Sequence, residues 1–268
     1  MNNKNNKTKL KTPSAPALER GLALLELLAT SKSGLTLPEL TRRLELPKSS
    51  THCLLVTLER LGYLRRNEKT SRYLFGLKLF SLANLALSGL DLREQAAPYL
   101  RALMERTRFT VHMAILEQGE AVLVEKVEAP GLLKLASWVG KRMEVHCTGL
   151  GKALIAHLPE AELDRLIREH GLPRYNENTI RSARRLKENL ALARQQGFTV
   201  DDEEEELGFR CLGSPLFDHT GGVVAAISVA GTTAQITPEN LPALAREVTK
   251  TAAAISLALG FHPDGARE

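Results

Sequence analysis

The chain has 268 residues, 43% of them hydrophobic and 4% aromatic, with a formal net charge of +5; this length suits about two domains whose cores rely on Leu, Ala and Val. No apolar run approaches the roughly 20 residues of a membrane-spanning helix, and the polar start, residues 1–16, lacks the hydrophobic segment of a secretory signal and is expected to form a flexible basic arm. The three cysteines, Cys53, Cys147 and Cys211, are widely spaced, which argues against a disulfide framework and indicates a cytoplasmic protein.

The first predicted element is an amphipathic helix over residues 17–30, ALERGLALLELLAT. Its apolar residues recur at helical spacing. We expect this helix to bury Leu18, Leu22, Leu25 and Ala29.

A second, shorter helix is predicted to end at Leu44. Thr36 and Glu39 have the spacing of a capping box, and Pro38 suits the first turn, where the helix makes no use of an amide hydrogen. We expect Leu40 and Leu44 to face inward.

The stretch Pro47–Leu64, PKSSTHCLLVTLERLGYL, follows after a break at Leu46 and predicts a third helix. Its apolar stripe contains Leu54, Leu55, Leu58 and Leu61. The opposite side carries Ser49, His52, Cys53, Val56 and Arg60, which are the residue types that contact phosphates, base edges and thymine methyl groups. An ordinary surface helix would show the same periodicity, but two helices joined by a tight turn within about 25 residues have the spacing of a helix-turn-helix.

A short hairpin is predicted next, from residues 63–66 and 72–75 joined by a polar turn. Arg65, Arg66 and Arg72 lie on its strands and Lys69 lies at its tip. Such a wing beside a recognition helix can place cations on neighbouring DNA phosphates. The elements to this point therefore predict a winged helix-turn-helix.

The basic excess is confined to this part of the chain. Residues 1–76 hold 14 Lys and Arg against 6 Glu and no Asp, whereas residues 77–268 hold 22 Lys and Arg against 25 Asp and Glu. This asymmetry is typical of a polyanion-binding module joined to a neutral or acidic one. A surface that attracts an acidic substrate is the alternative, but it does not require the charge to be segregated by domain.

The next segment, residues 77–92, is apolar on most of its circumference. We expect a linker helix that packs against its copy in a dimer, with burial inside one domain as the alternative. Beyond it, strands and helices follow without the regular rhythm of a doubly wound sheet, which predicts an α+β domain with antiparallel strands. The expected strands are residues 110–117, 121–127, 132–138, 198–201, 209–217 and 223–230, and the expected helices are residues 148–157, 159–170, 182–196 and 238–260.

Candidate ligand-binding residues lie in the string GLGKAL. Gly149 and Leu150 open a helix whose first amide hydrogens can bind a carboxylate. A dinucleotide fingerprint is the rival interpretation, but the third glycine is missing, and helix packing without a ligand is a further alternative. Asp201 begins the acidic run DDEEEE at a strand end and can turn inward, whereas such runs usually face solvent.

A thiol- or zinc-dependent hydrolase is the alternative function. His146, Cys147 and Cys211 would supply its base and nucleophile, or would gather zinc with Asp201. No CxxC or HExxH spacing supports this, a thiol in an apolar strand is usually a small buried hydrophobe, and a hydrolase has no use for the basic first domain. An architectural DNA-binding protein would not need the second domain. We therefore predict no catalytic residues, metal or cofactor.

The chain resembles the IclR family of bacterial transcriptional regulators from Ala17 to Gly260. The resemblance rests on ALERGLALLELLA, LPKSSTHCLLVTLERLGYL, VGKRMEVHCTGLGKALIAHLP and GFTVDDEEEELGFRCLGSPLFDHTGGVVAAISVAG. It implies a winged helix-turn-helix domain at residues 17–76 for double-stranded operator DNA, a linker helix at residues 77–92, and an effector-binding domain with a GAF-like antiparallel sheet and flanking helices at residues 93–262. It also implies a homodimer or a dimer of dimers, and a small carboxylate effector.

The DNA-binding set comes from the third helix and the hairpin and is Lys48, Ser49, Ser50, His52, Cys53, Val56, Arg60, Arg65, Arg66, Lys69 and Arg72. The resemblance assigns the effector-binding set, which is Leu132, Leu135, Met143, Gly149, Leu150, Asp201, Phe209, Cys211 and Ser228. Two positions depart from the family pattern: Cys53 stands where members usually have Arg, and Ala230 stands where many have Ser.

Overall fold

A computed structural model describes residues 15–31, 33–88, 91–131 and 135–262, with the backbone alone at 83–88 and 91. The chain divides into two compact units, Met1–Leu87 and Ser88–Glu268, and the division falls inside the predicted linker. Residues 1–14 of the predicted arm lie outside the described residues.

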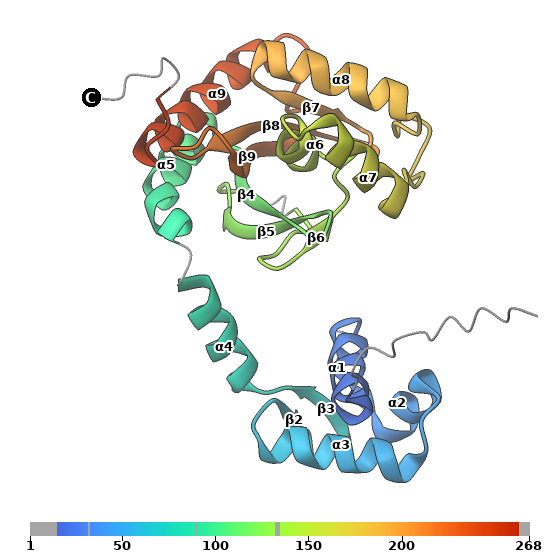
Figure 1. Ribbon diagram of the computed structural model, residues 1–268. Coiled ribbons are helices and arrows are strands. Elements are labelled where there is room, and N and C mark those ends of the chain that lie inside the picture. Colours follow the sequence, from blue (N-terminus) through green and yellow to red (C-terminus); the bar gives the residue numbers. More distant parts are fainter. Residues whose placement is uncertain (1–14, 32, 89–90, 132–134, 263–268) are drawn as a thin grey trace, which may run out of the picture. The chain divides into compact units, whose positions relative to one another are not determined.

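The first unit is a winged helix-turn-helix, as the sequence predicts (Figure 1). Its strands form an antiparallel sheet in the order β1-β3-β2. The short β1 was not predicted from the sequence; it pairs Leu35 with Tyr73 and adds a third strand to the wing. The elements are α1 (Pro16–Ala29), β1 (Leu35–Thr36), α2 (Leu37–Leu44), α3 (Lys48–Arg60), β2 (Leu64–Arg66), β3 (Arg72–Phe75) and α4 (Leu77–Ser88).

The capping box at the start of α2 is confirmed. The backbone N–H and the hydroxyl of Thr36 both donate to Glu39 Oε2, at 2.7 and 2.8 Å. These bonds hold the pKa of Glu39 below its usual value. At its other end, α2 stops at Glu45, which adopts a left-handed conformation with φ of +53°.

The predicted inner face of α1 is wrong, because Leu18 is 62% exposed and Leu22 is also exposed. The helix is apolar around most of its circumference, and the face that packs inward contains Gly21, which lies against Leu54 of α3. Leu61 was also predicted to face inward and is 41% exposed, because α3 ends at Arg60 and the chain turns there. The buried core of this unit consists of Leu24, Leu28, Leu35, Leu40, Leu55, Leu64 and Tyr73.

The second unit has a six-stranded antiparallel sheet in the order β6-β5-β4-β9-β8-β7, which confirms the predicted α+β class. Figure 1 shows α5 and α9 together on one side of the sheet and α6, α7 and α8 on the other. The elements are α5 (Asp91–Thr107), β4 (Thr110–Glu117), β5 (Glu120–Val127), β6 (Arg142–Met143), α6 (Gly149–Ile155), α7 (Glu160–His170), α8 (Ala183–Gln196), β7 (Thr199–Asp202), β8 (Phe209–Phe217), β9 (Val223–Thr232) and α9 (Leu241–Ala258).

Two expectations for this unit need correction. The helix α5 was not predicted at all. The strand predicted over residues 132–138 is not present in its described part, 135–138, because the chain folds there into tight turns. The Ser137 amide donates to Leu135 O at 2.8 Å and the Lys141 amide to Trp138 O at 3.0 Å. The edge of the sheet is formed instead by the two-residue β6.

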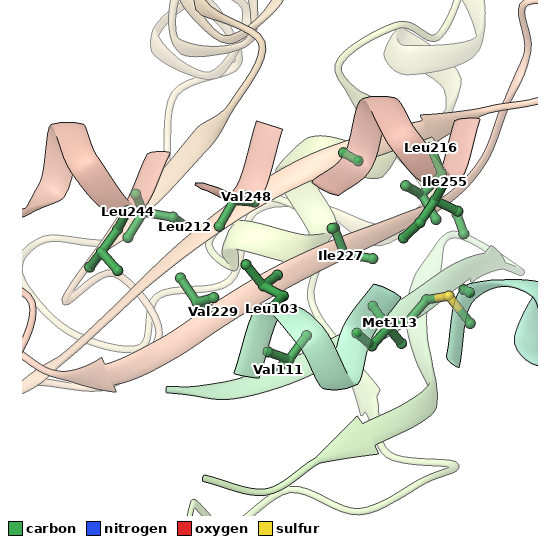
Figure 2. Close-up of a cluster of buried hydrophobic side chains, with 14 of the residues drawn as sticks. Leu103, Val111, Met113, Leu212, Leu216, Ile227, Val229, Leu244, Val248 and Ile255 are labelled. Carbon is green, nitrogen blue, oxygen red and sulfur yellow. The ribbon is translucent and has the colours of Figure 1, made fainter. Parts of the chain in front are cut away.

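Alternation along the strands gives the sheet two different faces. One face packs against α5 and α9 in a continuous apolar core, where Val111, Leu212 and Ile227 lie close to Leu103 and Val248 (Figure 2). The other face carries polar residues in register. His112 pairs with Ser228 across β4 and β9, and Asp201 pairs with Cys211 across β7 and β8. Among the described residues, no helix combines the length and hydropathy required of a bilayer span.

Candidate functional site

The outward surface of α3 is the candidate nucleic-acid interface. Lys48, Ser49 and His52 are exposed, as are Cys53, Val56 and Arg60, whereas Ser50 is half-buried. The helix is held from behind by Leu55 and by Thr51, whose hydroxyl donates to Pro47 O at 3.2 Å. Six of the seven residues predicted on this helix are therefore free to contact a ligand.

The wing supplies cations next to this helix in the sequence. Arg65 and Arg66 on β2 are exposed, and so is Lys69 in the turn. The Arg66 guanidinium donates to Ser71 Oγ at 3.2 Å and lies 5.8 Å from the centre of the Tyr73 ring, which orients its side chain. These groups suit phosphate contacts.

Arg72 differs from the other predicted cations because it is bound within the domain. Its Nη1 donates to Gly34 O at 2.6 Å and to Glu39 Oε2 at 3.4 Å. The side chain therefore connects β3 to the start of α2. This structural role was not predicted from the sequence.

The second candidate site is a cavity of about 300 Å³ inside the second unit. Its floor is the polar sheet face, its wall is the start of α6, and its rim comes from the segments before β6 and after β7. Eight of the nine residues predicted to bind an effector line it, and the ninth, Leu132, lies outside the described residues. The eight are Leu135, Met143, Gly149, Leu150, Asp201, Phe209, Cys211 and Ser228.

Several lining residues were not predicted. His112 comes from β4, Ser137 and Lys141 come from the segment before β6, and Glu205 and Glu206 come from the acidic run. The alternation of polar and apolar residues in β4 was a signal for His112, but its position in the cavity depends on the register with β9. The acidic run was predicted to face solvent beyond its first residue, and that is wrong for Glu204, which is buried, and for the half-buried Glu203 and Glu205.

Close backbone packing places α6 against the sheet. A Cβ on Gly213 would lie 2.3 Å from Gly149 O, and a Cβ on Gly149 would lie 3.3 Å from Cys211 Cβ. The Thr199 hydroxyl donates to the same Gly149 carbonyl at 2.7 Å. Thr148 caps the helix by accepting the Gly151 amide at 3.0 Å. The start of α6 therefore forms a fixed wall of the cavity.

Asp201 is the most perturbed acid of the cavity. Its side chain is buried, and Oδ1 accepts the Glu204 amide at 2.8 Å. Burial raises the pKa of the Asp201 carboxyl from its ordinary 3.8 to about 7, against the opposing effects of this hydrogen bond and of Lys152. Burial likewise raises the pKa of Glu205. Two of the acids that line the cavity therefore ionise less readily than usual.

A buried ion pair stands behind the cavity wall. Lys152 of α6 is fully buried and donates both to Val200 O, at 2.5 Å, and to the Glu204 carboxylate. The second carboxylate oxygen of Glu204 has no hydrogen-bond partner in the described structure. This ammonium thus connects α6 with the residues on both sides of Asp201.

His112 lines the cavity as an uncharged ring. Its Nε2 lies 2.8 Å from Ser137 Oγ. Burial, followed by the charges of Lys126 and Lys141, lowers the pKa of His112 to about 4. The ring can therefore exchange hydrogen bonds with a ligand without adding positive charge.

The groups proposed for a hydrolase are not arranged for catalysis. Burial raises the pKa of the Cys147 and Cys211 thiols far above the neutral range, which disfavours the nucleophilic thiolate. His146 Nε2 lies 3.0 Å from Pro173 O and its Nδ1 lies 3.5 Å from Glu144, and no described hydrogen bond joins this ring to a thiol. Within the described ranges, no three His, Cys, Asp or Glu side chains are grouped to hold a metal.

Comparison with known families matches both units. The family described as bacterial transcriptional regulator IclR C-terminal matches residues 84–257, and the IclR helix-turn-helix domain matches residues 17–68. The transcriptional repressor IclR of Escherichia coli strain K12 is 36% identical over 251 residues, which is 93% of this chain and 92% of that protein.

Solved structures agree with the fold. The crystal structure of the Thermotoga maritima IclR matches with a TM-score of 0.78 and 30% identity, covering 92% of this chain and 99% of that one. An IclR homologue from Microbacterium hydrocarbonoxydans, complexed with 4-hydroxybenzoate, matches with a TM-score of 0.78 and 24% identity, covering 90% and 99% of the two chains.

Proposed function

Because this chain belongs to the IclR family of bacterial transcriptional regulators, we propose that it binds operator DNA through α3 and the wing, and that a small organic acid in the cavity changes its DNA affinity. It is a DNA-binding regulator with a C-terminal effector-binding domain, and we place its action in the cytoplasm.

The exposed polar face of α3 supports the first part. His52 and Val56 lie one turn apart on this face, where an imidazole can read a base edge and a methyl-rich side chain can meet a thymine methyl group. Arg65 and Arg66 continue the surface with cations for phosphates. We therefore assign sequence reading to α3 and positioning to the wing.

Binding of a candidate operator and of a random duplex, each at several salt concentrations, tests this division. Arg65→Ala should weaken both to a similar extent and reduce the salt slope by about one, whereas His52→Ala should change which bases are preferred. Arg184→Ala is the control, because Arg184 is an exposed arginine of the second unit, paired with Glu188 at 2.8 Å. A loss confined to one duplex with an unchanged slope would contradict a phosphate role for Arg65.

The cavity supports the second part. It is the size of a small metabolite, its wall is the start of α6, and apolar side chains stand beside groups able to hydrogen-bond. Lys141, Gly149, Leu150 and Ser228 all line it, and we assign the carboxylate of the effector to Lys141 and the amides at Gly149 and Leu150, and its hydroxyl or keto oxygen to Ser228. A structural neighbour complexed with 4-hydroxybenzoate supports an acid of this size, although the match itself extends only to the fold.

Calorimetry with a panel of small carboxylates, followed by operator titration with and without each ligand, tests the effector. A coupling of about 1 to 3 kcal/mol between acid and DNA is expected. Ser228→Ala should weaken binding of the acid and leave DNA binding in the absence of acid unchanged. Ser214→Ala is the matched control, because Ser214 is a buried serine of the same sheet that lies outside the cavity and donates to Gly197 O at 2.8 Å. The effector proposal fails if no acid binds, or if a bound acid leaves operator affinity untouched.

We also propose that two copies associate through the exposed apolar residues of the first unit. Leu77 is 83% exposed and Phe80 is 67% exposed on α4, and Leu18 and Leu22 are exposed on α1. Large apolar side chains that lie one helical turn apart on a surface are typical of a contact with another protein surface. Light scattering of Phe80→Asp should show a smaller particle than wild type. The control Leu192→Asp, at an exposed leucine of α8, should not.

A further inference from the structure

The carboxyl group of Asp201 has few partners for a charged form. Its side chain is 3% exposed, and the described residues give it one hydrogen bond, from the Glu204 amide at 2.8 Å. A buried carboxylate normally keeps its charge by accepting several hydrogen bonds or by meeting a free cation. The ionised form of Asp201 is therefore poorly stabilised.

The cations around the cavity do not supply the missing partner. The Lys152 ammonium is held by Glu204 and by Val200 O. Lys141, at the rim, donates to Ala136 O at 3.3 Å and lies 5.9 Å from the centre of the Trp138 ring. In the proposed function Lys141 meets the carboxylate of the effector, so neither ammonium is left to pair with Asp201.

The other titratable groups make the cavity more acidic. Glu205 and Glu206 line it together with Asp201. His112, on β4 of the same sheet, stays neutral, and the thiols of Cys147 and Cys211 stay protonated, for the reasons given above. An anion placed here adds to an excess of carboxyl groups, and protonating the most buried of them removes the repulsion at least cost.

We propose that Asp201 meets the effector as a neutral acid, donating its proton in a hydrogen bond to an acceptor oxygen of the bound anion. The proton is taken from the solvent on binding and returned when the effector leaves, and no covalent bond changes in the effector. This inference rests on the proposed function. It adds that the effector presents an acceptor oxygen to Asp201 and binds together with a proton.

Burial raises the pKa of Asp201 to about 7, which places the proton uptake in an accessible range. Below this pH the free protein already carries the proton, so acid affinity should be nearly constant. Above it, affinity should fall by about tenfold for each pH unit, because each binding event must first protonate the site. The acid itself stays ionised throughout this range.

Calorimetry of the full chain tests whether a proton is taken up when the acid binds. Pyruvate, lactate and 4-hydroxybenzoate would be titrated at pH 6 and pH 8, the latter in both phosphate and Tris, whose ionisation heats differ. At pH 8 the wild type should take up close to one proton per bound acid. Asp201→Asn, whose amide still donates and whose oxygen still accepts the Glu204 amide, should bind the same acid with no proton uptake and equal affinity at both pH values. Asp202→Asn is the control, because Asp202 is exposed and paired with Arg210, and it should behave as wild type.

Two results separate this inference from the function on which it rests. If an acid binds with the same heat in both buffers at pH 8, Asp201 is not protonated on binding. The inference then fails, but the proposed effector binding stands. If Asp201→Asn stays folded but loses acid binding at both pH values, the carboxylate is needed in its charged form. The inference then fails as well, and the proposed effector binding stands. If none of the acids binds the wild type, both the proposed effector binding and the proposed proton uptake are refuted. Should the variant unfold, the two-buffer measurement on wild type still decides the question.

Discussion

Asp201→Asn should make the second unit more stable at alkaline pH, although it alters a residue of the proposed site. In the unfolded chain this carboxyl ionises with a pKa near 3.8, and in the folded chain near 7. Folding therefore binds the proton more tightly, so the wild type loses stability as the pH rises between these two values and stays at the lower level above about 7. Asparagine has no proton to lose.

The size of the effect follows from the same two values. At about 1.4 kcal/mol for each pKa unit, the difference corresponds to at most about 4 kcal/mol in favour of the variant at pH 8, and about 2 kcal/mol of that should disappear by pH 5.5. Because the side chain is buried, solvent screening does not reduce this figure greatly.

Urea unfolding of the full chain at pH 5.5 and pH 8 measures the difference. Circular dichroism follows both units, and the fluorescence of Trp138, the single tryptophan of the chain, follows the second unit alone. Asp202→Asn is again the control and should change little at either pH. The difference in free energy of unfolding between Asp201→Asn and wild type could also be the same at both pH values, or larger at pH 5.5. Either result would show that burial does not raise the pKa of the Asp201 carboxyl.

Three further substitutions test other parts of the structure. Lys152→Met should destabilise the second unit by about 3 to 5 kcal/mol in thermal or urea unfolding, because it leaves the buried Glu204 carboxylate unpaired, and adding Glu204→Gln should recover most of the loss. Arg72→Ala should lower the melting temperature of the first unit as well as its DNA affinity, unlike a change at a free phosphate contact. Cys53→Arg should leave the melting temperature unchanged and increase duplex affinity, because Cys53 is exposed on α3; an unfolded variant would contradict that placement.

Much of the fold could be predicted because local signals were strong. The capping box at Thr36 and Glu39 marked the start of α2, and the apolar runs of β8 and β9, separated by the turn DHTGG, gave both strands close to their observed ends. The face of α1 could not be predicted, because a helix that is apolar on most sides offers several inner faces. The choice depends on a neighbour, since Gly21 permits the approach of Leu54.

The cavity was predictable where its residues lie within recognisable motifs, as Gly149 and Asp201 do. It was not predictable for His112, whose place depends on pairing with Ser228, more than a hundred residues away in the chain. Arg72 was misjudged for a related reason. Charge and position in a hairpin suggested a free cation, while its partner Gly34 is set by tertiary structure.

A regulator of this kind needs a contact that depends on its ligand, and Asp201 on the floor of the cavity would provide one. An acid can alter DNA affinity only if it binds two states of the protein unequally. Lys152 connects α6 to Val200 and Glu204, so the two walls of the cavity are joined by one buried ammonium whose bonds flank Asp201. An acid that meets a protonated Asp201 would form a hydrogen bond where an ionised Asp201 would repel it. The protonation state of Asp201 would then set both how tightly the acid binds and how much of that binding energy is available to change the protein.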